Sequence, residues 1–172
     1  MMRLLLPALA VATMLAGCGP DAASELALGK RLLTGGAGAP ADARTAVSHL
    51  RHAAESGLPA AAYHLGLLYQ RGAPGLQADR AAALHWLGAA AQTGLPQAQF
   101  MLGQMLLDPL SSDPAQARLW FEKAATQEHA EANLELAMAY RRGDLGLLPD
   151  AQQAERYLME SQHAQKHRSP PP

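Results

Sequence analysis

The sequence predicts an all-α fold, an α-solenoid of about four antiparallel helix hairpins. A motif of a small residue, an aromatic residue and then Leu-Gly recurs along the chain, with anchors at Gly29, Gly66, Gly103 and Ala137. These anchors are 37, 37 and 34 residues apart, and self-similarity at such a period indicates stacked units that cannot bury their apolar faces alone. Of the 172 residues, 49% are apolar, many of them alanine, the best helix former, whereas β-branched residues are few.

Residues 1–17 are predicted to form a lipoprotein signal peptide, followed by a lipidated N-terminus and linker over 18–23. Arg3 supplies a positive charge, and the apolar stretch from Leu4 to Ala16 is too short to span a ~30 Å hydrocarbon core. The stretch ends in Leu15-Ala16-Gly17-Cys18, which resembles the bacterial lipobox. That resemblance implies a diacylglyceryl thioether on Cys18, cleavage before it and acylation of the new N-terminus. The alternative is an ordinary secretory signal with an incidental cysteine.

The residue after the cysteine bears on the destination of such a lipoprotein. Gly19 stands where an aspartate would act as an inner-membrane retention signal in many Gram-negative bacteria. The lipobox resemblance therefore implies an outer-membrane lipoprotein that faces the periplasm. Two or three acyl chains would hold it stably, since each buried CH₂ contributes ~0.8 kcal/mol.

The clearest unit covers residues 59–95 and divides into two predicted helices. The first runs from about Ala60 to Arg71, where residues at spacings of three and four form one apolar face. A Gly-Ala-Pro-Gly turn over 72–75 separates it from the second, which runs from about Asp79 to Thr93. Asp79 stands where an N-cap must accept bonds from free backbone N–H groups.

The other units repeat these helix start and stop signals. Equivalent caps are predicted at Asp42, Asp113 and Asp150, and Pro114 follows Asp113 at the favoured first helical position. Between units, Gly-Leu-Pro over 57–59 and again over 94–96 predicts a helix stop followed at once by a helix start, so neighbouring helices must run antiparallel. The third junction, over 127–130, lacks both glycine and proline, and we expect a less sharp turn there.

Together these residues resemble the Sel-1-like repeat, a relative of the tetratricopeptide repeat. The strongest unit carries the motif at Gly57, Tyr63, Leu65, Gly66, Tyr69, Gly72, Asp79, Ala83, Trp86, Ala90 and Gly94. The resemblance implies a repeat domain over 24–165, with units at about 24–58, 59–95, 96–129 and 130–165, the first of them degenerate. Residues 166–172 are predicted to be a disordered tail because they end in three prolines.

Candidate catalytic and metal-binding residues have simpler structural explanations. His49, His52 and Glu55 share one side of a helix at metal-ligand spacing, but His49 holds the position of Trp86 and Trp120, so packing is the favoured interpretation. The glycine-rich run over 35–38 is read as a turn, since no strand precedes it. We therefore expect no enzyme activity, no cofactor and no metal site. The net charge of −1 argues against nucleic-acid binding.

The family resemblance implies that first helices line a concave face and that variable positions beside the motif contact a partner. On this chain those positions are Lys30, Gln70, Arg71, Gln97, Gln104, Asp108, Glu131, Met138, Arg141 and Arg142. The predicted function is a membrane-anchored periplasmic module that binds a peptide or partner protein of the bacterial envelope. Two alternatives remain open: a protein that binds or hydrolyses β-lactams or cell-wall fragments, and a purely structural envelope spacer.

Overall fold

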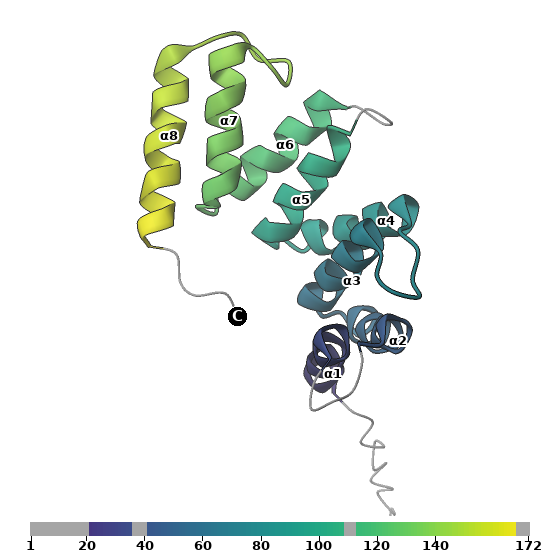
Figure 1. Cartoon of the computed structure of the whole chain (residues 1–172). Helices are drawn as coiled ribbons and strands as arrows, with labels where there is room; N and C mark the ends of the chain where they lie inside the picture. The colour runs from purple at the N-terminus through teal and green to yellow at the C-terminus, as the bar shows by residue number, and fades with distance from the viewer. Residues whose placement is uncertain (1–20, 36–40, 109–112, 168–172) are drawn as a thin grey trace, which may run out of the picture.

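The computed structural model describes residues 21–35, 41–108 and 113–167, and these residues form eight α-helices (Figure 1). The helices are α1 (Ala22–Thr34), α2 (Ala43–Glu55), α3 (Pro59–Arg71), α4 (Arg80–Gln92), α5 (Pro96–Leu106), α6 (Pro114–Ala125), α7 (Ala130–Arg142) and α8 (Ala151–Lys166). The only β-type pairing among the described residues is an isolated bridge between Ala73 and Leu76. None of the described helices is both long and apolar enough to cross a membrane.

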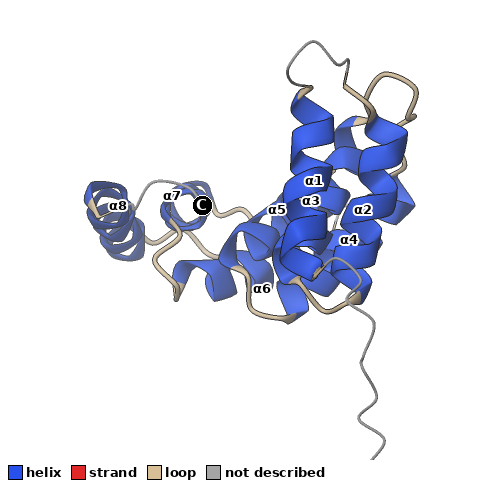
Figure 2. Ribbon diagram, turned by 90° about the horizontal axis from the view of Figure 1, so that it is seen from below, coloured by secondary structure: helices blue, strands red, loops and turns tan. Residues whose placement is uncertain are grey.

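The helices form four hairpins, α1–α2, α3–α4, α5–α6 and α7–α8, and each helix packs against the next along the chain. Figure 1 shows the hairpins following one another along a curved path. In Figure 2 the helices α7 and α8 are seen along their axes whereas α1 to α4 lie across the view, so the stack twists as it advances. The all-α solenoid of four hairpins is therefore confirmed, and the degenerate first unit forms a complete hairpin.

Aspartate caps fix the start of every second helix, as predicted. The carboxylates accept backbone N–H bonds at 2.9–3.0 Å from Thr45 to Asp42, from Ala82 to Asp79, from Gln116 to Asp113, and from Gln152 and Gln153 to Asp150. Each cap satisfies an N–H group that would otherwise lack a partner. Bonds from the Thr45 side chain and backbone also hold the pKa of the Asp42 carboxyl below its usual value.

The recurring glycine of the motif allows the two helices of a hairpin to approach closely. A Cβ built at Gly66 would lie 2.6 Å from Leu87 Cγ and 3.0 Å from the Leu87 backbone nitrogen. A Cβ at Gly103 would lie 2.6 Å from Cε1 of Phe121. Leu87 and Phe121 are fully buried, so these glycines admit the largest side chains of the core between paired helices.

The tryptophans of α4 and α6 pack at the contacts between neighbouring hairpins. Trp86 and Trp120 are both half-buried and pack against an apolar cluster that joins α3, α4 and α5 and includes Ala98 and Leu102. Their expected packing role is confirmed, although neither ring is fully buried. The Lys123 ammonium lies 4.0 Å from the centre of the Trp120 ring and covers part of its exposed surface.

The third junction turns as sharply as the others, so the expected difference is wrong. Glu128 adopts a φ of 57°, the left-handed conformation that Gly57 (88°) and Gly94 (93°) adopt in the other junctions. His129 then acts as the N-cap of α7, and its Nδ1 accepts a bond of 3.3 Å from the Ala132 N–H. Tertiary packing holds a non-glycine residue in a conformation that its own Cβ disfavours.

The ends of the repeat domain differ slightly from the predicted boundaries. The first helix begins at Ala22, inside the predicted linker, because Asp21 accepts a bond from the Ser24 N–H and caps it. The last helix extends to Lys166, which was assigned to the tail, and Ala164 in its final turn is buried. The described residues do not include the predicted signal peptide, Cys18, residues 36–38 of the predicted glycine-rich turn or residues 168–172 of the predicted tail.

Candidate interaction surface

Three of the predicted contact residues come together in one hollow between the second and third hairpins. Gln70 at the end of α3 and Gln104 and Asp108 at the end of α5 line a space of about 460 Å³. Ala78, Arg80, Met105 and Leu107 complete its described lining. We call this space the repeat 2–3 hollow. It forms because the ends of two successive first helices lie beside the start of α4.

Arg80, which the repeat pattern did not predict as a site residue, links two sides of this hollow. Its Nη2 donates to the Met105 carbonyl at 2.7 Å, and its Nη1 lies 3.3 Å from Asp108 Oδ2. The guanidinium therefore joins the start of α4 to the end of α5 in the next hairpin. The available signal was its departure from the repeat, since the residue after the capping aspartate is small or a proline in the other units.

Two glutamines, Gln70 and Gln104, contribute amide groups to the lining of the hollow. The Oε1 atom of Gln70 is buried, and no described group donates a hydrogen bond to it. The Gln104 side chain, near the end of α5, is exposed and also lines the hollow. An amide side chain carries both donors and an acceptor, the groups that pair with an extended peptide backbone. A buried acceptor without a donor is unfavourable until a ligand supplies an N–H group.

The other predicted contact residues do not join this hollow. Gln97 and Glu131 line a smaller space of about 210 Å³ between the third and fourth hairpins. Arg141 borders a hollow beside Asp150 and Glu155, and Arg142 forms an ion pair of 2.7 Å with Asp144. Arg71 is exposed at the end of α3, whereas Lys30 and Met138 are half-buried. The structure thus distributes the ten residues over several separate surfaces.

Lys30 of α1 lies near His64 of α3, which places two first helices on one face. Burial lowers the pKa of the His64 imidazole below its ordinary value of 6.5, and the positive charge of Lys30 lowers it further. Neutral His64 is therefore favoured in the folded protein, whereas the unfolded chain takes up a proton near pH 6.5. This contribution to stability is complete above pH 6.5 and is lost as the pH falls towards the lower pKa of the folded state.

We expect His64→Gln to weaken the loss of stability on acidification. Between pH 7.5 and pH 5.5, urea unfolding of the native protein should show a larger fall in the free energy of unfolding than unfolding of this variant. His52→Gln is the matched control, because His52 is exposed. An identical pH dependence for native protein and His64→Gln would show that His64 does not contribute.

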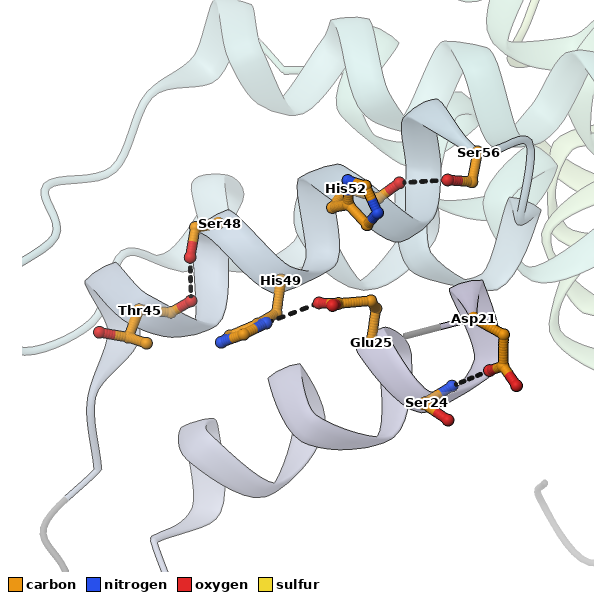
Figure 3. A network of polar contacts seen from close by, with 8 residues as sticks. All are labelled: Asp21, Ser24, Glu25, Thr45, Ser48, His49, His52 and Ser56. Atoms are coloured by element: carbon orange, nitrogen blue, oxygen red, sulfur yellow. Dashed lines mark hydrogen bonds and ion pairs between the residues drawn. The ribbon is translucent and has the colours of Figure 1, made fainter. Parts of the chain in front are cut away.

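His49 and His52 of the first hairpin have different surroundings in the folded protein. Figure 3 shows the His49 imidazole on α2 and the Glu25 carboxylate on α1 pointing toward one another, and His49 Nδ1 lies 2.6 Å from Glu25 Oε2. His52 and Glu55 are exposed, and the His52 ring is turned away from that pair. No three His, Cys, Asp or Glu side chains within the described ranges are grouped to hold a metal ion.

Comparison with solved structures places this architecture among helical-repeat proteins. A crystal structure of c5321, described as a protective antigen of uropathogenic Escherichia coli with an SLR fold, aligns with a TM-score of 0.77 and 34% identity over 83% of this chain. A Sel1 repeat protein from Oxalobacter formigenes aligns with a TM-score of 0.75 and 32% identity over 84% of it. The chain spans 30% and 59% of those two proteins, respectively.

The fold extends to more distant proteins. The immunity protein Pa5087 from Pseudomonas aeruginosa aligns with a TM-score of 0.55 at 16% identity, over 85% of this chain and 69% of that protein, and this likeness concerns the fold alone. A comparison with curated proteins found no significant match. The Sel1 repeat family matches at residues 20–58, 59–95, 96–129 and 130–158, one match for each hairpin, and the last match ends inside α8. The chain therefore belongs to the Sel1 repeat family.

Proposed function

We propose that this protein is a lipid-anchored periplasmic module that binds a peptide or partner protein of the bacterial envelope through the repeat 2–3 hollow. Sel1-repeat proteins generally mediate protein–protein interactions, and their fold is typically a non-catalytic scaffold. Membership of the Sel1 repeat family supports a role in protein–protein interaction. The hollow supports the choice of binding surface on this chain.

The observation that carries the proposal is the buried Gln70 Oε1, for which the described part of the chain provides no donor. An extended peptide presents a row of backbone N–H and C=O groups, and one N–H would satisfy this oxygen. Gln104 on the opposite helix end would pair with a second backbone group. Arg80 would keep the two helix ends in place, so little ordering would be needed on binding.

The binding site is tested by changing both glutamines together. We expect Gln70→Ala combined with Gln104→Ala to reduce capture of the envelope partner at least about tenfold, since buried polar contacts typically contribute more than 1 kcal/mol. Capture is measured by affinity purification from crosslinked envelopes with quantitative mass spectrometry. Gln92→Ala is the matched control, because Gln92 is exposed at the end of a second helix. Equal capture by the double variant and the control would reject the hollow as the binding surface.

The anchor rests on the lipobox at residues 15–18 and is tested separately. We expect Cys18→Ala to abolish incorporation of a labelled fatty acid and to release the protein from the outer-membrane fraction, because the thioether lipid has no other attachment point. Ser24→Ala is the control, since it leaves the lipobox intact. Unchanged membrane association of Cys18→Ala would contradict the anchor without bearing on the hollow.

A further inference from the structure

Three of the four buried polar residues in the described part of the chain occupy the same position of the repeat. Glu25, Gln99 and Asn133 are 6%, 5% and 1% exposed, and each stands four residues before the motif's anchor position. The second unit carries Ala62 there, also buried. This position faces the interior of the hairpin, so a polar side chain in it needs an internal partner.

Two of these residues have such partners. Glu25 contacts His49 of α2, as described above. The Gln99 side chain donates to the Ala91 carbonyl at 3.3 Å and accepts a bond of 2.9 Å from the amide of Gln127. Gln127 lies just after α6, so the third repeat supplies a matched amide for its own buried amide.

The side-chain oxygen of Asn133, the third of these residues, has no such internal partner among the described residues. This Oδ1 atom is buried, and no group of the described residues donates a hydrogen bond to it. In the fourth hairpin the repeat register places Ala164 where the third hairpin has Gln127. A methyl group replaces the amide that would have met Asn133. The fold thus retains a buried acceptor in the very hairpin that has lost its internal donor.

Asn133 borders a hollow that also carries two carboxylates. Ala125, Glu128, Asn133, Met159, Glu160 and His163 line a hollow of about 480 Å³. The carboxylates come from the α6–α7 junction and from α8, while Met159 is 62% exposed and offers an apolar wall. None of these residues belongs to the repeat 2–3 hollow.

We propose that this hollow binds an arginine side chain of a protein partner. A planar guanidinium carries five N–H donors and no acceptor, so it can pair with Glu128 and Glu160 and also donate to Asn133 Oδ1 when a turn of the Asn133 side chain brings that atom to the hollow. Its aliphatic stem would lie on Ala125 and Met159. The described acidic and histidine side chains form no three-membered group suited to a metal ion, which favours an organic cation over a metal. This site is separate from the repeat 2–3 hollow, and the proposal does not depend on that hollow.

The site is tested with N-acetylarginine methylamide as the probe and with the citrulline and lysine analogues for comparison. The full chain is purified in mild detergent, and ¹H–¹⁵N spectra report the Asn133 side-chain amide during the titration. We expect the arginine probe to shift this resonance and to bind at least about tenfold more tightly than the neutral citrulline analogue, because charge-assisted bonds are lost in the latter. Equal binding of citrulline would overturn the proposal, and equal binding of lysine would overturn the choice of a guanidinium.

Variants of the lining residues distinguish a binding site from a structural effect. Glu128→Gln combined with Glu160→Gln changes two exposed side chains and should weaken arginine binding at least about fivefold, with Glu55→Gln as the exposed control. Asn133→Leu should abolish the binding while leaving the melting temperature unchanged or higher, because it removes a buried acceptor without a donor. Undiminished binding by either variant would contradict the proposal.

Discussion

Replacing Gly66 with alanine is expected to destabilise the protein by about 2 kcal/mol, because overpacking a filled core costs ~1–3 kcal/mol. The added Cβ would lie 2.6 Å from Leu87 Cγ and 3.0 Å from the Leu87 backbone nitrogen. A side chain could rotate away, but the backbone of α4 could not move without disturbing the hairpin. Urea unfolding followed by circular dichroism measures this loss.

The matched control is Gly88→Ala, because Gly88 lies in the middle of α4 and a Cβ there would meet nothing within 4 Å. Alanine is favoured over glycine inside a helix by ~1 kcal/mol, so this variant should be more stable than the native protein. Both substitutions replace glycine with alanine, but we expect Gly66→Ala to lower the free energy of unfolding and Gly88→Ala to raise it. A gain of stability in Gly66→Ala would contradict the close-approach explanation of the motif.

Replacing Phe121 with alanine is expected to destabilise the protein by about 3–5 kcal/mol, the range for truncating a buried aromatic residue. Phe121 is fully buried, and its ring lies 5.7 Å from that of Phe100 in a cluster that joins the third and fourth hairpins. The cavity would therefore weaken both the hairpin and the seam between repeats. Urea unfolding measures the change, with Leu119→Ala on the exposed side of α6 as the control.

The pairing of Phe121 with Gly103 gives this prediction a second, sharper readout. Alone, Gly103→Ala should destabilise, because its Cβ would lie 2.6 Å from the Phe121 ring. In the Phe121→Ala background the space is empty, and the same substitution should be neutral or stabilising. A double-mutant cycle measures this coupling. Additive effects of the two substitutions would show that the residues do not constrain one another.

The framework of this protein was predictable because its signals are local and are repeated. The helix start and stop signals act within a few residues of the chain, so they can be recognised in the sequence without knowing the fold. Examples are the cap at Asp79, the helix stop at Gly57 and the proline at residue 59. Repetition at a period of 34–37 residues then assigned a packing role to Gly66 and Trp86. The same repetition predicted a packing role for His49, whereas its imidazole makes a polar contact of 2.6 Å with the buried Glu25 carboxylate of α1.

The features that escaped prediction depend on contacts between units. Glu128 takes a left-handed conformation because the junction must match its neighbours, although its own propensity disfavours it. Arg80 reaches the carbonyl of Met105 in the next hairpin, a contact that no local pattern encodes. The unpaired acceptor of Asn133 becomes visible only when its hairpin is compared with the one before it. The separation of the ten predicted contact residues over several surfaces is likewise visible only in the fold.

The central claim, that the repeat 2–3 hollow is the partner-binding surface, is tested most directly by site-specific photo-crosslinking in intact cells. A benzophenone amino acid is incorporated in place of Gln104 and, as the control, in place of Gln92. We predict that irradiation joins one discrete envelope protein to the chain from position 104 and not from position 92, and that Gln70→Ala diminishes this product. A discrete product from position 92, with none from position 104, would contradict it.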